Sequence, residues 1–171
     1  MPNAEDIRNT NEWATLDSVI DVRQFYKDNN SVHEIQRIVG LENRKFGSVI
    51  EKMVREIYSL SSPESSKHDA IFISSGRTQT KIEIKAARYW AGTDNCKWQH
   101  LEPEYDYTHI LFVLIDFNAI RVWVADKRPL FSKGLLTPQG KQGFWGDKNT
   151  LLASGYLTEI HTALDLSKEL P

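Results

Sequence analysis

Cysteine is almost missing from this sequence, and so is any long apolar segment. The single cysteine, Cys96, excludes an internal disulfide framework and a zinc site built from several cysteines, and it fits a reducing cytoplasm. The longest purely apolar run, from Ile110 to Ile115, has the length of a strand and is far too short to span a membrane. The first residues provide neither a basic start nor an apolar run, so we expect no signal peptide and a cytoplasmic location.

Neither sign of charge is in large excess, because 21 Lys and Arg stand against 23 Asp and Glu. This balance argues against a protein that coats nucleic acid. Two blocks are nevertheless basic: residues 65–100 hold six Lys and Arg against three acids, and residues 127–148 hold five against one. Such blocks favour a bound phosphate backbone, although each block alone is equally well explained as a solvated face. With 40% hydrophobic and 26% charged residues, the chain has the composition of one globular domain, residues 1–171.

The periodicity of apolar residues divides the domain into an N-terminal helical segment (1–41), a core (42–126) and a loop-rich C-terminal part (127–171). The strongest helical pattern runs from Glu42 to Leu60 and is followed by a breaker loop (residues 61–66) and an apolar hairpin. The continuous apolar run from Thr108 to Phe117 is typical of a strand buried on both faces. We therefore predict an α/β fold with a mixed sheet and a β-hairpin flanked by helices.

Weaker patterns predict the remaining elements. Apolar residues in 16–29 have helical spacing, and Ser31-x-x-Glu34 predicts a capping box that opens a short helix ending at Gly40. Residues 90–107 are expected to be irregular or to form a short helix. Residues 127–149, which hold four glycines, are expected to form a long loop, and Thr162 is expected to cap a last short helix.

The hairpin brings acids and a lysine together. Asp69 begins its first strand, and Glu83 and Lys85 lie on the second, after the turn Ser75-Gly76-Arg77. If the loop has an odd number of residues, such as three centred on Gly76, Asp69 comes level with Glu83, with Cβ atoms about 5 Å apart. A slip of one residue would move the Asp to the other face. The apolar back of the hairpin and this polar front predict one functional face.

These residue types suit a divalent cation beside a phosphate. Mg²⁺ prefers oxygen ligands, usually one or two carboxylates with water and phosphate oxygens. A metal held this way lowers the pKa of bound water and polarises a phosphoryl oxygen. Lys85 would supply a compact positive charge for the attacking water or for the developing charge on the phosphate. The alternative is an amphipathic hairpin whose solvated face happens to carry Lys81, Glu83 and Lys85.

Asp69, thirteen intervening residues and then Glu83-x-Lys85 resemble the PD-(D/E)XK nuclease signature, with His68 where the motif name has Pro. The order of elements resembles the small type II restriction endonucleases over residues 42–126. The resemblance implies a restriction-endonuclease-like core in which Asp69 and Glu83 hold Mg²⁺, with the Ile84 backbone carbonyl as a third ligand. It implies that Lys85 positions or activates the attacking water.

The resemblance also implies accessory residues. Glu51 lies on the first core helix, where such enzymes often carry a Glu that binds metal or water; an ordinary surface pair with Arg55 is the alternative. Gln99 and His100 follow at a distance where such enzymes often place a Gln or His facing the scissile phosphate. A packed Trp98 with two polar neighbours is the competing explanation for that stretch.

Base-specific contacts require side chains that enter the major groove. Within residues 127–149 we expect Gln139, Lys141 and Gln142 to make them, because this segment combines donors with glycines. Further basic side chains expected to contact DNA are Lys81, Arg88 and Arg44.

The sequence thus predicts a Mg²⁺-dependent endonuclease acting on double-stranded DNA, most simply a type II restriction enzyme. A homodimer is expected because two-fold symmetry lets one active site per chain cut both strands of a symmetric site. Two alternatives remain open. One is a repair or recombination nuclease on the same core. The other is a non-catalytic DNA-binding regulator, because residues 31–54 are compatible with a helix-turn-helix.

Overall fold

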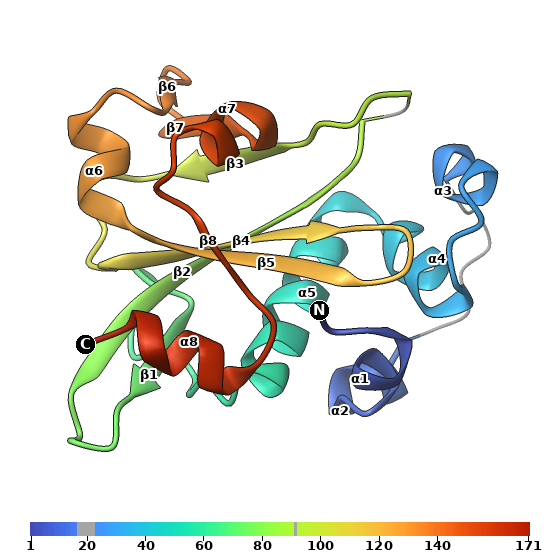
Figure 1. Cartoon of the computed structure of the whole chain (residues 1–171), viewed down its shortest axis with the longest axis horizontal. Helices are drawn as coiled ribbons and strands as arrows, with labels where there is room; N and C mark the ends of the chain where they lie inside the picture. Colours follow the sequence, from blue (N-terminus) through green and yellow to red (C-terminus); the bar gives the residue numbers. More distant parts are fainter. Residues whose placement is uncertain (17–22, 91) are drawn as a thin grey trace.

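The computed structural model describes residues 1–16, 23–90 and 92–171. Within these residues a main sheet of five strands crosses the molecule, and a smaller sheet of three strands lies beside it (Figure 1). The main sheet has the order β1-β2-β4-β5-β8, with bounds β1 (Ala70–Ile73), β2 (Gln79–Arg88), β4 (His109–Ile115), β5 (Ile120–Asp126) and β8 (Thr158–Ile160). The predicted α/β class with a mixed sheet is confirmed.

The mixed character of the main sheet arises at β2. Strand β2 is antiparallel to β1, with which it forms the predicted hairpin, but parallel to β4. The remaining pairs, β4 with β5 and β5 with β8, are antiparallel. From Ile110 to Ile115, β4 is buried throughout, as its uninterrupted apolar sequence predicts.

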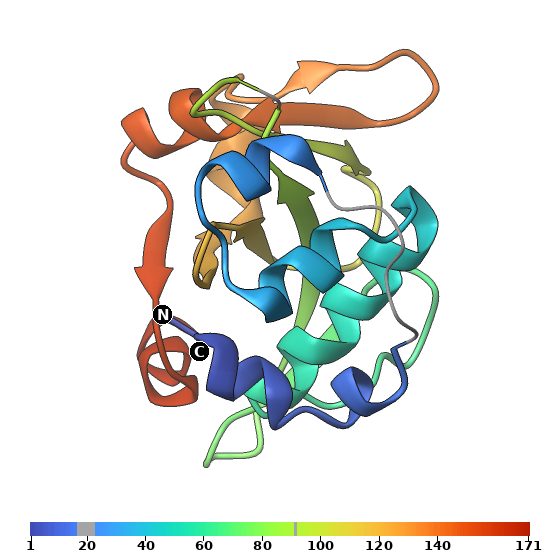
Figure 2. The same cartoon turned by 90° about the vertical axis from the view of Figure 1, so that its right-hand side faces the viewer.

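Helix α5 (Asn43–Ile57) covers one face of the main sheet beside β2. Its buried residues recur at helical spacing, as expected for a helix with one apolar stripe: Phe46, Val49, Ile50, Met53 and Val54. Glu42 caps its start by accepting from the backbone N–H groups of Arg44 and Lys45. Figure 2 shows the short helices gathered on the same side of the sheet: α1 (Ala4–Arg8), α2 (Asn11–Ala14), α3 (Gln24–Asp28) and α4 (His33–Val39).

The other face of the main sheet is covered by the small sheet, of order β3-β7-β6. Trp98 of β3 is fully buried, with its ring centroid 4.9 Å from that of Phe112 and 6.0 Å from that of Trp123. This aromatic cluster joins the two sheets. The elements of this layer are β3 (Lys97–Leu101), α6 (Lys127–Ser132), β6 (Thr137–Pro138), β7 (Phe144–Asp147) and α7 (Lys148–Ala153).

Several weaker predictions need correction. The segment 90–107 contains strand β3, and 127–149 contains two helices and two strands rather than a long loop. Their short, mixed patterns give weak local signals, and β3 becomes regular by pairing with β7, more than 40 residues away. Within the stretch 16–29, which is predicted to be helical, the structure contains the short helix α3. Residues 17–22 lie outside the described part.

The predicted capping box at Ser31 is also wrong. Helix α4 begins after Val32, which makes no side-chain cap, and the Glu34 carboxylate instead accepts a hydrogen bond from Arg8 at 2.6 Å. A tertiary ion pair has therefore displaced the local cap. The end of α4 at Gly40 and the capping of α8 (Ala163–Glu169) by Thr162 are confirmed.

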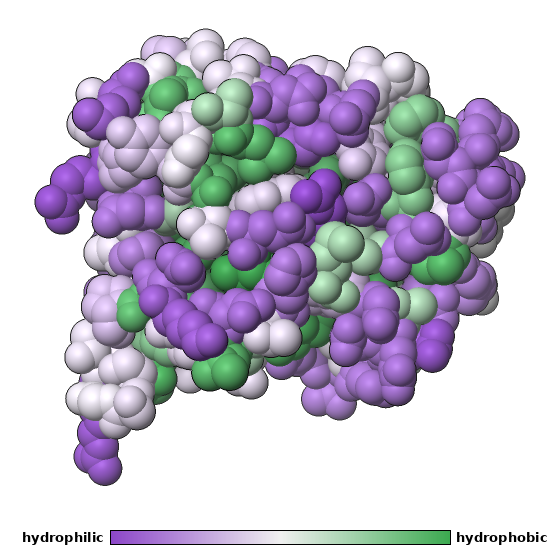
Figure 3. Space-filling model, viewed as in Figure 1, coloured by the Kyte–Doolittle hydropathy of each residue, from purple (hydrophilic) through white to green (hydrophobic). Residues whose placement is uncertain are grey.

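Figure 3 shows hydrophilic side chains over most of the right-hand end of the molecule, around α3. No helix in the described ranges is both long and apolar enough to cross a membrane.

Candidate functional site

The hairpin register places Asp69 beside Glu83. Ala70 pairs with Ile82 and Ile73 with Gln79, so the paired positions sum to an even number, as the proposed site requires. The connection is a three-residue loop centred on Gly76: the Ser74 N–H donates to the Thr78 carbonyl at 2.9 Å. The residue with positive φ is Arg77, at 65°, rather than the glycine. The predicted register is thus confirmed.

Beyond this pairing, β2 has an open edge. Strand β1 starts at Ala70, so from Glu83 onward no strand formed by the described residues extends the main sheet on that side of β2. The Asp69 carboxylate takes the place of the missing strand by accepting a hydrogen bond from the Ile84 N–H at 2.8 Å. In a strand, the N–H and C=O groups of one residue point to the same side. The Ile84 carbonyl therefore faces the same open edge as its N–H. The edge therefore presents a carboxylate and a carbonyl side by side.

Glu83 is crowded against Asp69. It is buried, with 4% of its surface exposed, although it is an acid. Burial, followed by hydrogen bonding to Asp69, raises the pKa of Glu83 well above its usual range, while Lys85 opposes the shift. Two carboxylates held this closely repel each other, and a cation beside them removes that repulsion. This donor set therefore has the chemistry of a site for a hard divalent cation.

Lys85 extends from the same face of β2 as Glu83. Its Nζ lies 3.9 Å from Glu83 Oε2, and its side chain remains partly exposed. A lysine in this position balances the two acids and reaches the solvent above them. The structure thus brings together the three residues that the sequence motif singled out.

Glu51 approaches the site from α5. Its Oε1 accepts a hydrogen bond from Arg55 Nη1 at 2.9 Å, and the same nitrogen donates to the Asp69 carbonyl at 3.1 Å. The pKa of Glu51 is raised to about 7, first by burial and then by Asp69, with Arg55 and Lys85 opposing the shift. The helical pair with Arg55 is therefore real, and it also holds Glu51 next to the acids.

Gln99 and His100 face the site from β3, on the opposite wall. Strand residues normally alternate between faces, yet both of these neighbours line one cleft. A β-bulge explains this: Trp98 pairs with Gly146 and Leu101 with Phe144, so two residues of β3 lie opposite one of β7. His100 adopts a positive φ of 63°, a conformation that costs free energy for a residue with a Cβ. This backbone conformation turns His100 toward the cleft.

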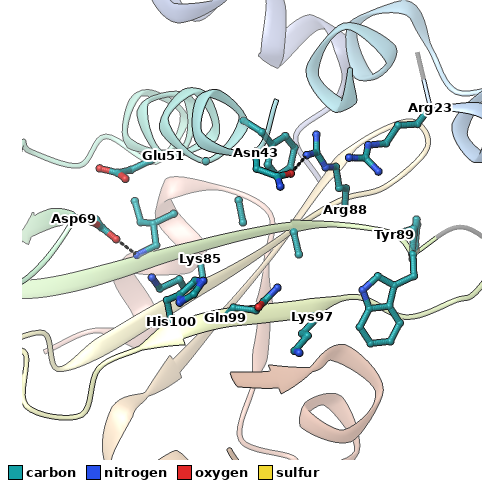
Figure 4. Close-up of a pocket in the computed structure, with 16 residues that line it drawn as sticks. Arg23, Asn43, Glu51, Asp69, Lys85, Arg88, Tyr89, Lys97, Gln99 and His100 are labelled. Carbon is teal, nitrogen blue, oxygen red and sulfur yellow. Dashed lines mark hydrogen bonds between the residues drawn. The ribbon is translucent and has the colours of Figure 1, made fainter. Parts of the chain in front are cut away.

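These residues line a single cleft of about 580 Å³ between α5 and β3, with the open edge of β2 as its floor (Figure 4). Figure 4 shows Asp69, Glu51, Lys85, Gln99 and His100 gathered at one end. Glu83, buried beneath Lys85, is absent from the lining.

The DNA-contact candidates are scattered around this cleft. Arg88 lines its far end, whereas Lys81 bonds to Asp106 at 3.3 Å and Arg44 lies exposed on α5; neither lines the cleft. Lys141 and Gln142 are exposed at the tip of the hairpin between β6 and β7, which extends from the molecule in Figure 2.

Gln139, at the base of that hairpin, donates from Nε2 to Gln99 Oε1 at 3.2 Å. This bond fixes the orientation of the Gln99 amide group with its oxygen toward Gln139. The amide nitrogen of Gln99 can then donate to a ligand. Gln139 therefore orients a residue of the cleft, a role that sequence reasoning did not foresee.

His68 does not belong to the site. Its ring is buried, with Nδ1 3.0 Å from Asp106 Oδ1, and its Nε2 accepts from the Glu64 N–H at 3.0 Å. It joins the breaker loop to the segment before β4.

Sequence reasoning gave no role to two charged residues of the cleft, Arg23 and Lys97. No local motif marks them, because each becomes part of the cleft only through the packing of α3, α5 and β3 around β2. Lys97 also stacks on Trp145, with Nζ 4.1 Å from the ring centroid.

No three His, Cys, Asp or Glu side chains within the described ranges are arranged to hold a metal ion by themselves. A cation here would need two carboxylates, a carbonyl and water, which is the usual ligand set of Mg²⁺. No family model, curated protein or solved structure matches the chain. The functional argument therefore rests on the residues and their geometry.

Proposed function

We propose that the chain is a Mg²⁺-dependent endonuclease of the PD-(D/E)XK type that hydrolyses phosphodiester bonds in double-stranded DNA. One observation carries the proposal: Asp69 and Lys85 line the cleft at the open edge of β2, and Glu83 is buried beside both. Such an edge lets a phosphate approach carboxylates, a carbonyl and a lysine together. A merely solvated hairpin face would not bury Glu83 against Asp69.

The residues present fit a magnesium ion. Asp69 and Glu83 would hold it with the Ile84 carbonyl; burial and then the hydrogen bond with Asp69 raise the pKa of Glu83, so a cation beside the two carboxyls would favour their ionised forms. When bound, the ion supplies a water of lowered pKa and a positive charge beside the phosphoryl oxygen.

The side chains around that position have distinct tasks. Lys85 orients the attacking water and offsets negative charge on the phosphate. Glu51, held by Arg55, keeps a further water in place, and the His100 side chain on the opposite wall orients water. In the reaction a bond forms between water oxygen and phosphorus, the bond to the leaving oxygen breaks, and a proton passes to that oxygen.

The substrate and the assembly are part of the proposal. A type II restriction enzyme would cut a symmetric site as a homodimer, with one cleft for each strand. The projecting hairpin that carries Lys141 and Gln142 is suited to reach a groove beyond the cleft. A repair or recombination nuclease would use the same cleft without that specific reading.

The helix-turn-helix alternative receives less support from the packing. Helix α5, which would be the reading helix, lies along β2 and turns Asn43, Gly47 and Glu51 toward the cleft. These residues are thereby committed to the cleft rather than to an outer DNA-facing surface.

The test is incubation of the purified protein with supercoiled plasmid in Mg²⁺, in Ca²⁺ and in EDTA. Nicked or linear DNA in Mg²⁺ alone supports the nuclease. Tight DNA binding without cleavage in any of the three would favour the regulator.

A further inference from the structure

The end of the cleft away from the acids is basic. Arg88 of β2, Arg23 just before α3 and Asn43 at the start of α5 line it, and all three also line an adjoining hollow of about 500 Å³. Figure 4 shows the guanidinium groups of Arg23 and Arg88 next to Asn43, at the far end from Asp69. Two cations thus meet in a concave, accessible place.

Arg88 is fixed there by its surroundings. Its Nη1 donates to the carbonyls of Val39 and Leu41 at 2.9 and 2.7 Å, its Nη2 donates to Asn43 Oδ1, and it stacks over Phe46. These partners are neutral, so they orient the guanidinium without cancelling its charge. Burial and then the proximity of Arg23 lower the pKa of Arg88 to about 10.

Arg23 completes the pair, and among the described residues its terminal nitrogens make no hydrogen bond. Its Nε donates to the Val39 carbonyl at 3.1 Å, which turns the side chain toward Arg88. Within the described ranges no carboxylate lies at ion-pair distance from either arginine. Glu42, the acid at this hollow, already caps α5. Planar guanidinium groups arranged this way suit a phosphate, which accepts several N–H donors at once.

The basic end is too far from the acids to serve the same phosphate. Asn43 and Glu51 are eight residues apart on one helix, a distance of about 12 Å. Between them lies Gly47, where an added Cβ would have no atom within 4 Å, so the middle of the cleft is open. A ligand that reaches both ends must be extended and must carry more than one anionic group.

We infer that Arg23 and Arg88 bind a second, uncleaved phosphate of the nucleic-acid strand whose cleaved phosphate lies at Asp69 and Lys85. This inference rests on the proposed function, since it names the part of the same substrate that the far end holds. The strand would lie along α5, over Gly47, with one phosphate at each end of the cleft. Its backbone would be positioned by the arginines before any chemistry occurs.

The test measures DNA binding in Ca²⁺ as a function of salt for Arg23→Gln, because Arg23 is exposed and its loss leaves the bonds of Arg88 intact. The matched control is Lys27→Gln, which removes an equal charge from the exposed surface of the neighbouring helix α3. Arg23→Gln should lower affinity about tenfold, as one lost charge-assisted contact predicts. The slope of log K against log salt should fall by about 0.9. Lys27→Gln should change neither quantity appreciably.

A second measurement locates the contact. Methylphosphonate replacement removes the charge of one phosphate at a time from the DNA, and at one position near the cleaved bond it should weaken the wild type. At that position Arg23→Gln should lose nothing further, because the contact is already gone. Equal salt slopes for Arg23→Gln and Lys27→Gln, or additive losses at every position, would overturn the inference. If the protein cleaves DNA in Mg²⁺ but the two variants have equal salt slopes, only the second phosphate site is refuted. If the slopes differ as predicted but no DNA is cleaved, only the nuclease function is refuted.

Discussion

Replacement of Glu51 by glutamine should stabilise the metal-free protein at high pH and have little effect at low pH. The pKa of Glu51 is raised from 4.5 to about 7, chiefly by burial and by Asp69. The folded state therefore holds a proton that the unfolded state releases at lower pH. The contribution of protonated Glu51 to stability is fully present below about pH 4.5. It is lost as the pH rises through about 7, because ionised Glu51 is unfavourable in its buried position beside Asp69.

The size of the effect follows from the shift. One pKa unit corresponds to about 1.4 kcal/mol, so the shift sets an upper limit of about 3 kcal/mol. The Glu51 side chain is 30% exposed, and solvent screening reduces the expected gain to about 1–2 kcal/mol. For a chain of this length, 1 kcal/mol moves the melting temperature by about 2–4 °C. Glutamine keeps an oxygen that can accept from Arg55, so little is lost elsewhere.

Thermal unfolding with EDTA at pH 5 and pH 8.5 measures this prediction. Glu51→Gln should melt about 2–8 °C above the wild type at pH 8.5 and close to it at pH 5. Glu64→Gln is the control, since it removes an exposed carboxylate of the breaker loop. A lower melting temperature at pH 8.5, or the same difference at both pH values, would refute the crowding of Glu51 against Asp69.

Three further predictions concern the metal, the lysine and the hairpin. Mg²⁺ at 100 times its dissociation constant should stabilise the wild type by about 2.7 kcal/mol, which raises the melting temperature by roughly 5–10 °C. Glu83→Gln should lose this rise in melting temperature, and an equal rise in both proteins would place the ion elsewhere. Lys85→Ala should slow cleavage of bound DNA by about 100-fold or more while DNA binding in Ca²⁺ stays within about tenfold; unchanged single-turnover rates with lost binding would make Lys85 a backbone clamp. Alanine at Lys141 or Gln142 should weaken binding to the cognate site by about 1–3 kcal/mol more than to random DNA, and equal losses on both DNAs at both positions would assign sequence reading to another segment.

The site at the hairpin could be predicted from sequence because its rules are local. Alternating apolar residues fix which face of β2 carries Glu83 and Lys85, and the turn at Gly76 fixes the register with Asp69. The resemblance to PD-(D/E)XK nucleases suggested Glu51, and the strong periodicity of its helix shows that this residue flanks the buried stripe. The assignment of these residues to DNA cleavage remains a prediction.

The resemblance suggested Gln99 and His100, but the strand that carries them on the opposite wall of the cleft could not be predicted, because it depends on contacts between distant segments. Strand β3 is stabilised by β7, more than 40 residues away, and by the burial of Trp98 between the sheets. His100 has positive φ although no glycine marks the position, so the bulge leaves no local signal. Gln139 likewise gains its contact with Gln99 only through the pairing of β3, β7 and β6.

The most direct measurement of the central claim compares the rates of plasmid cleavage in Mg²⁺ for wild type, Asp69→Asn and Asp28→Asn. Asparagine keeps the size of Asp69 and an oxygen that can accept from the Ile84 N–H, but it removes the charge that a hard cation needs. Asp28 is an exposed aspartate of α3 outside the cleft. We predict cleavage by wild type and Asp28→Asn at similar rates, and none by Asp69→Asn, with all three proteins folded. Wild-type cleavage by Asp69→Asn, or no cleavage by the wild type, would contradict the assignment of this cleft to phosphodiester hydrolysis.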